Sequence, residues 1–112
     1  MLKILTFRFN PFEENCSLAW DETGDAVIID PGFYDEGEAG ALYGKIAEKG
    51  VRPVMVLLTH GHFDHIFGVR ECADRYRIPV YMNQEDNYVL ENNFSQRFGL
   101  KAPDSSFVTK PL

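Results

Sequence analysis

The first third of the chain alternates between apolar and polar residues, and this period of two predicts β-strands. We expect strands over residues 2–9, 16–20 and 25–29, with a turn at Glu22-Thr23-Gly24 before the third strand. The polar breaks between these segments are short, and short connections suit antiparallel neighbours. The pattern therefore predicts an antiparallel meander at the start of the fold.

The period then changes from two to about 3.6, which predicts a helix over residues 39–49. Gly50 follows at the position where a helix end favours a left-handed residue. The residues on the predicted inner face are Ala39, Leu42, Tyr43 and Ile46. The chain is therefore α/β, with strands before and between helices.

The middle of the chain predicts a strand, a helix and a further strand. Residues 54–58 form a continuous apolar run after Pro53, which favours a strand covered on both faces. A helix over residues 65–75 and a strand over residues 78–82 should follow, and Asn83 could cap a short helix from Gln84. The inward-facing residues expected for the longer helix are Ile66, Val69, Ala73 and Tyr76. The pattern weakens from residue 92 onward, and we expect one domain over residues 1–112 without an internal boundary.

The composition argues against nucleic-acid-binding, membrane and disulfide-rich proteins. The chain has 112 residues, 17 acidic against 11 basic ones and a formal net charge of -6, so nucleic acid is a poor partner. It contains no membrane span and no secretory signal, so we expect a cytoplasmic protein that does not bind membranes. The cysteines Cys16 and Cys72 are too few for a disulfide framework, and we expect both to be buried structural residues.

All three histidines lie in the segment Thr59-His60-Gly61-His62-Phe63-Asp64-His65, directly after the apolar strand. If the chain leaves the strand extended, His60 and His62 point to the same side. Asp64 and His65 would begin the next helix and face the same space. Asp64 could instead only cap that helix beside exposed histidines, but three histidines and an aspartate in one turn favour a metal site. Such ligands suit Zn²⁺, Fe²⁺ or Mn²⁺ better than Ca²⁺ or Mg²⁺.

This segment resembles the H-x-H-x-D-H signature of the metallo-β-lactamase superfamily. The resemblance implies the N-terminal half of a four-layer αββα fold, a mixed and largely antiparallel sheet with helices on one face. It also implies that His60 and His62 bind a first metal and that Asp64 and His65 bind a second.

Two further segments carry the resemblance. Residues 27–32 end in Asp30-Pro31-Gly32, which is similar to the family's strand-ending D-P-G. There Asp30 would support the metal loop without touching the metal, although the same tripeptide could be only a tight turn. Residues 15–18 are similar to a stretch of glyoxalase II-like members, although they could equally be an ordinary buried strand.

The implied activity is hydrolysis of a thioester or another acyl ester, as in hydroxyacylglutathione hydrolase. One or two zinc ions would supply a metal-bound hydroxide, and Asp64 would act as a catalytic residue that orients it. An iron-dependent persulfide dioxygenase of the same superfamily is the alternative enzyme. A fragment that only binds metal or associates with itself is the non-catalytic alternative.

The family supplies further ligands from its C-terminal half, whereas this sequence has no histidine after His65. We therefore expect the chain to be a truncated, inactive part of a parent enzyme that acts on a small-molecule substrate. The second half would have covered the inner face of the sheet. We expect that exposed apolar face to form a homodimer.

Overall fold

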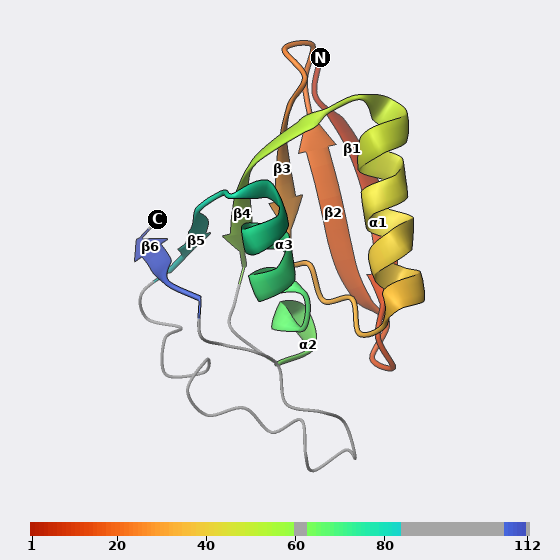
Figure 1. The fold of residues 1–112 in the computed structure, drawn as a ribbon, viewed down its shortest axis with the longest axis vertical. Coiled ribbons are helices and arrows are strands. Elements are labelled where there is room, and N and C mark those ends of the chain that lie inside the picture. Colours follow the sequence, from red (N-terminus) through yellow and green to blue (C-terminus); the bar gives the residue numbers. More distant parts are fainter. Residues whose placement is uncertain (60–62, 84–106, 112) are drawn as a thin grey trace.

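A computed structural model describes residues 1–59, 63–83 and 107–111 and shows a mixed sheet with helices on one face (Figure 1). The α/β architecture predicted from the sequence is confirmed. The strands are β1 Lys3–Phe9, β2 Glu14–Trp20, β3 Asp25–Ile29, β4 Arg52–Leu58, β5 Val80–Met82 and β6 Thr109–Pro111; the helices are α1 Glu36–Lys49, α2 Phe63–Ile66 and α3 Val69–Tyr76.

The six strands lie in the sheet in the same order as in the chain. β1 with β2 and β2 with β3 are antiparallel, while β3 with β4, β4 with β5 and β5 with β6 are parallel. The helix α1 returns the chain from β3 to β4, and α2 with α3 does so between β4 and β5, so these neighbours run parallel. The predicted meander is confirmed for β1 to β3, but the balance of the whole sheet differs from the largely antiparallel one that we expected.

One face of the sheet packs against α1 and α3 and holds the core. Leu18 of β2 pairs with Ile28 of β3, and Ile28 pairs with Val56 of β4, and all three side chains are fully buried. The two cysteines are free thiols in this core, as predicted. Burial of this apolar face against the helices supplies the main favourable term for folding.

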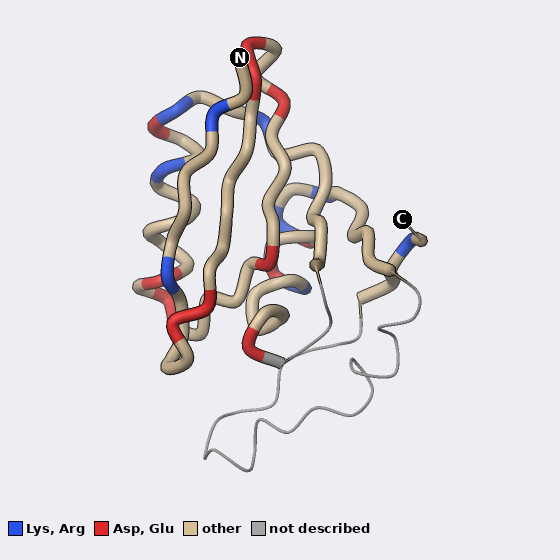
Figure 2. Tube along the Cα trace, turned by 180° about the vertical axis from the view of Figure 1, so that it is seen from behind, with Lys and Arg blue, Asp and Glu red and all other residues tan. Residues whose placement is uncertain are grey.

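The other face of the sheet is open among the described residues (Figure 2). Its apolar residues are half-buried or exposed: Ile4, Ala19, Val27, Ile29, Met55, Leu57 and Tyr81. Burial therefore alternates along β4, and the prediction that this strand is covered on both faces is wrong for the described chain. The continuous apolar run arises because both faces of β4 carry apolar side chains, although only one face has a helix over it.

Helix α1 begins earlier than its apolar pattern predicts. Asp35 is the N-cap and accepts a hydrogen bond from the backbone N–H of Glu38 at 2.8 Å. Gly37 and Gly40 weaken the helical signal in this first turn. At the other end, Gly50 adopts a left-handed conformation with φ 65°, which confirms the predicted helix end.

The predicted helix over residues 65–75 is divided in two at Phe67 and Gly68. The backbone N–H of Gly68 donates to the carbonyl of Pro31 at 2.8 Å, so the chain is tied to the loop after β3 at this point. A Cβ on Gly68 would lie 2.4 Å from the ring of Phe33, so no larger residue fits there without movement. Tertiary packing therefore ends α2 at Ile66 in spite of the continuing apolar period.

The last elements are shorter than predicted or were not predicted. The strand expected over residues 78–82 covers only β5, and the short edge strand β6 had no clear signal. The helix expected from Gln84 lies outside the described residues. None of the helices in the described ranges is long and apolar enough to cross a membrane.

Candidate metal centre

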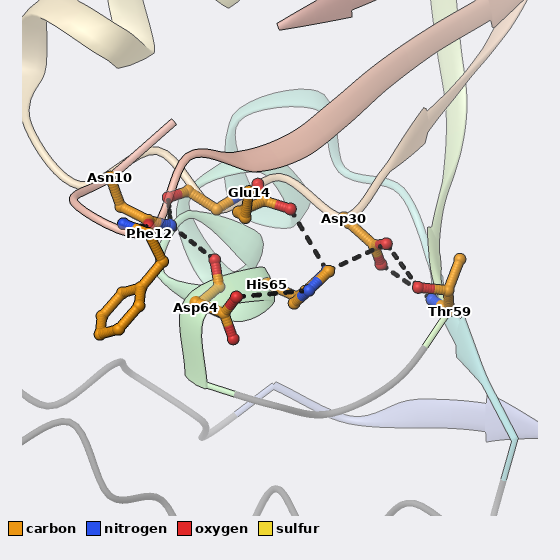
Figure 3. A network of polar contacts seen from close by, with 8 residues as sticks. Asn10, Phe12, Glu14, Asp30, Thr59, Asp64 and His65 are labelled. Carbon is orange, nitrogen blue, oxygen red and sulfur yellow. Dashed lines mark hydrogen bonds and ion pairs between the residues drawn. The ribbon is translucent and has the colours of Figure 1, made fainter. Parts of the chain in front are cut away.

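His65 lies at the centre of a cluster of polar side chains at the end of the sheet where β3 and β4 stop (Figure 3). Helix α2 carries it toward the β1–β2 turn. Its ring nitrogen Nδ1 is 3.2 Å from Oε2 of Glu14 and 3.1 Å from Oδ2 of Asp30. Its other nitrogen Nε2 is 3.4 Å from Oδ2 of Asp64. The two sides of the imidazole thus face different groups.

Asp30 is held by the residue that follows β4. Its carboxylate accepts hydrogen bonds from the backbone N–H of Thr59 at 2.8 Å and from the Thr59 hydroxyl at 2.5 Å. The backbone of Asp30 is left-handed, with φ 52°, although a proline follows it. Such a conformation costs about 1–3 kcal/mol and persists only where the surroundings hold it. The contacts to Thr59 and His65 are what hold it here.

Glu14 is a buried carboxyl at the first position of β2. Its side chain is 1% exposed, and its Oε1 accepts a hydrogen bond from the backbone N–H of Gly32 at 3.0 Å. Burial and the neighbouring Asp30 raise the pKa of Glu14 to about 9, while the Gly32 N–H opposes that shift. A buried carboxyl with a strongly shifted pKa is typical of a functional site.

Asp64 lies on the more open side of His65. Its side chain is 24% exposed, and its backbone carbonyl accepts a hydrogen bond from Nδ2 of Asn10 at 2.7 Å. The same Nδ2 donates to the carbonyl of Gly32 at 3.0 Å. Asn10 itself is left-handed, with φ 58°, a conformation that asparagine tolerates well. One amide therefore joins the β1–β2 turn, the loop after β3 and the start of α2.

Gly32 fits between these groups because it has no side chain. A Cβ at this position would lie 2.2 Å from the backbone oxygen of Asp64 and 2.4 Å from Oε1 of Glu14. Only glycine allows so close an approach. The glycine of Asp30-Pro31-Gly32 is thus explained by packing against α2.

The arrangement fits a transition metal bound between Asp64 and His65. Two ligands about 2.0–2.1 Å from a tetrahedral metal lie about 3.4 Å apart, which matches the separation of Oδ2 and Nε2. A metal-binding imidazole commonly donates its other N–H to a carboxylate, and Nδ1 of His65 faces two carboxylates.

The same cluster allows a second interpretation, in which Glu14, Asp30 and His65 bind an ion directly. Each offers one ligand atom, and these atoms lie within 4.8 Å of one another. However, Oε1 of Glu14 and both oxygens of Asp30 already accept hydrogen bonds from the protein. We therefore favour the first interpretation, in which these carboxylates orient His65.

The structure places the predicted site residues unequally. His60 and His62 lie outside the described residues, so their assignment as metal ligands stays a prediction. Asp30, Asp64 and His65 are brought together, although the 112-residue sequence separates Asp30 from the other two by more than 30 positions. Glu14 was not predicted as a site residue from the sequence. The sequence does contain a signal for this residue. Glu14, Cys16 and Leu18 are every second residue of β2 and lie on its buried side, where a carboxyl group is unusual.

A separate cavity of about 520 Å³ opens beside the N-terminal end of α1. None of its lining residues belongs to the polar cluster around His65. They are Phe33, Tyr34, Asp35, Glu36, Ala39, Phe67 and Glu71. These residues include no histidine, and their carboxyl groups do not form a close group of possible metal ligands in the described part of the chain.

Comparison with known proteins shows the family of the chain. Residues 9–110 match the model of the family described as "Metallo-beta-lactamase superfamily". The chain belongs to the metallo-β-lactamase superfamily. Members of this superfamily are metal-dependent hydrolases that bind one or two metal ions, and the described residues of this chain include a group that could hold one.

Three similar proteins show the range within the superfamily. Hydroxyacylglutathione hydrolase GloC of Haemophilus influenzae is 37% identical over 97 residues, which cover 84% of this chain and 44% of that protein. The structure of TTHA1623 in a di-iron-bound form has a TM-score of 0.79 at 30% identity and covers 96% of this chain and 53% of that one. ETHE1 from Myxococcus xanthus has a TM-score of 0.57 at 26% identity, covering 72% and 34%. The chain thus spans about half the length of such relatives or less.

Proposed function

We propose that this chain is part of a metal-dependent hydrolase that cleaves a thioester or another acyl ester, as hydroxyacylglutathione hydrolases do. The observation that carries the proposal is the arrangement of His65, whose Nε2 lies 3.4 Å from Asp64 Oδ2 while Nδ1 faces buried carboxylates. The similarity to GloC of H. influenzae supports the thioester class.

Asp64 and His65 would hold one metal ion, and His60 with His62 would contribute to the same centre or to a neighbouring one. Nitrogen and carboxylate ligands suit Zn²⁺, Fe²⁺ and Mn²⁺. A bound ion of this kind lowers the pKa of water toward about 7 and polarises a substrate carbonyl.

The residues of the chain have separate tasks in this proposal. His65 would bind the metal ion through Nε2. Asp30 contacts Nδ1 on the opposite side of the ring and so keeps the ring in place. Asp64 has a second carboxylate oxygen, which can accept a hydrogen bond from the attacking water and so aim it at the carbonyl. Asn10 fixes the backbone of Asp64 and therefore the direction of that carboxylate.

Metal content is the first test. We expect the chain, purified without chelator, to carry a transition metal by mass spectrometry and to lose it in the variants His60→Ala and His65→Ala. Glu13→Gln is the matched control, because Glu13 is exposed and its loss changes the charge without touching the cluster. Metal-free wild-type chain that also takes up no added Zn²⁺, Fe²⁺ or Mn²⁺ would contradict the proposed centre.

Turnover is the second test, and it separates the two candidate enzymes. Thioester hydrolysis releases a thiol from a hydroxyacyl thioester of glutathione, which a thiol reagent detects. A persulfide dioxygenase consumes oxygen with Fe²⁺ instead, and the similarity to a di-iron-bound structure justifies testing iron. Activity in a parent protein of full family length, without activity in the 112-residue chain, would support the view of this chain as a metal-binding but non-catalytic part.

The open face of the sheet leads to a proposal about partners. The relatives are about twice as long, and the 112 residues match about half of their length. We propose that, in the 112-residue chain, a second copy packs against this apolar face. The substrate in this proposal remains a small molecule.

A further inference from the structure

Glu14 is the one buried carboxyl in the cluster that neither the metal-binding motif nor the D-P-G turn explains. It is the first residue of β2 and lies 51 positions before His65 in the sequence. Its side chain is 1% exposed and ends 3.2 Å from Nδ1 of His65. A buried carboxyl is costly, so its position calls for a physical reason.

The two oxygens of Glu14 have different surroundings. Oε1 accepts the backbone N–H of Gly32, whereas Oε2 is fully buried and has no hydrogen-bond partner that meets strict geometry in the described residues. The atom that faces Oε2 is Nδ1 of His65. In contrast, both oxygens of Asp30 accept hydrogen bonds from Thr59. Glu14 therefore has an acceptor oxygen that no other described group uses.

The position of Glu14 is fixed independently of His65. Gly32 holds its Oε1, and Glu14 pairs with Phe9 at the end of the β1–β2 ladder. Cys16 and Leu18, the next residues on the same side of β2, lie in the core. The carboxylate is thus in place before any ligand binds, as a positioning group requires.

We propose that Glu14 is a positioning residue that accepts the Nδ1 proton of His65 together with Asp30 and so keeps Nε2 free to bind a metal. The proposal rests on the proposed role of His65 as a metal ligand. Imidazole has two neutral tautomers, and only the one protonated on Nδ1 presents a lone pair at Nε2. Two acceptors on one side of the ring favour that tautomer and also fix the rotation of the ring.

The variant Glu14→Gln tests this directly. Its amide has one acceptor and one donor end, so an NH₂ group meets either the N–H of Gly32 or Nδ1 of His65. We expect part of the His65 population to shift to the tautomer protonated on Nε2 and the affinity for Zn²⁺ to fall about 10–100-fold, the usual cost of losing such a partner. Glu13→Gln makes the same chemical substitution one residue earlier, at an exposed position outside the cluster, and it should leave both quantities unchanged.

Two readouts distinguish positioning from structural support. ¹⁵N NMR of the metal-free chain reports the tautomer of His65, assigned by its absence in His65→Gln, and Zn²⁺ titration reports the affinity. Wild-type His65 protonated on Nε2, or a Glu14→Gln variant with wild-type tautomer and affinity, would overturn the proposal. Should Glu14→Gln fail to fold, Glu14→Asp repeats the comparison, since it keeps the carboxyl group and withdraws it from His65 by one methylene. Neither readout involves hydrolysis, so a chain without turnover would refute the proposed activity and leave the role of Glu14 standing.

Discussion

The two faces of the sheet are built from similar apolar residues but have opposite surroundings. Ile28 and Ile29 are neighbours on β3, and Ile28 is fully buried under the helices while Ile29 lies on the open face and is half-buried. The same contrast holds along β2 and β4. Side-chain chemistry therefore does not determine which face belongs to the core of this chain; the crossover helices do.

Truncation of these two isoleucines should give the largest difference. Ile28→Ala leaves a cavity in a closed core and should cost about 2–5 kcal/mol of unfolding free energy. Ile29→Ala removes the same atoms from a face that water already reaches, so its cost should be clearly smaller. Urea unfolding of both variants measures the difference, and equal losses would show that the open face is covered in solution.

Packing on the covered side is tight enough to reject a single methyl group. Gly68→Ala places a Cβ against the Phe33 ring and should destabilise the chain by about 1–3 kcal/mol. Gly40→Ala is the matched control, because a Cβ there meets nothing within 4 Å. That change should stabilise α1 by about 0.5–1 kcal/mol. In thermal unfolding, the melting temperature should fall for Gly68→Ala and rise for Gly40→Ala. A Gly68→Ala variant with the wild-type melting temperature would refute the tight contact.

The open face can be tested as a contact surface with an added charge. Val27→Lys lies in the middle of that face and should turn a dimer into a monomer, because a lysine between two apolar sheets would lose its hydration. Ala41→Lys adds the same charge on the exposed side of α1 and should change nothing. Analytical ultracentrifugation over a range of concentrations measures both. A wild-type chain that is monomeric throughout would contradict the proposed dimer.

Thiol labelling compares the faces with no large change in stability. Cys16 is fully buried, and burial raises its pKa, so it should not react with iodoacetamide at neutral pH in the folded chain. Its neighbour on the other face, introduced as Ser17→Cys, should react readily in a dilute monomer. Its rate should fall as protein concentration rises if two copies associate, which mass spectrometry can follow. Equal labelling rates at positions 16 and 17 would show that the two faces do not differ in exposure to solvent.

The buried thiol of Cys72 should make the unfolding free energy depend on pH in the alkaline range. Burial raises the pKa of Cys72 from 9.0 to about 12, so the folded state favours the neutral thiol. Its contribution to stability is fully present below the unfolded pKa and is lost as the pH rises from about 9 to 12. Cys72→Ala should flatten this part of the stability profile, and an unchanged profile would show that other groups dominate it.

The sequence predicted the fold class, the first three strands and the end of α1, because these depend on local periodicity and on Gly50. It did not predict the break at Gly68, which depends on the ring of Phe33 and the carbonyl of Pro31. The same distinction applies to the site. The histidine segment is contiguous and therefore visible, while the approach of Glu14 to His65 joins residues 51 positions apart and needs the folded sheet.

The groups that surround Asp64 and His65 in the described structure all precede them in the chain. The acceptors on Glu14 and Asp30, the amide of Asn10 and the backbone of Thr59 are synthesised first. A ribosome adds about 5–20 residues per second, so Glu14 is synthesised seconds before His65. The side chains and backbone groups that line the imidazole are therefore already synthesised when His65 is added to the chain.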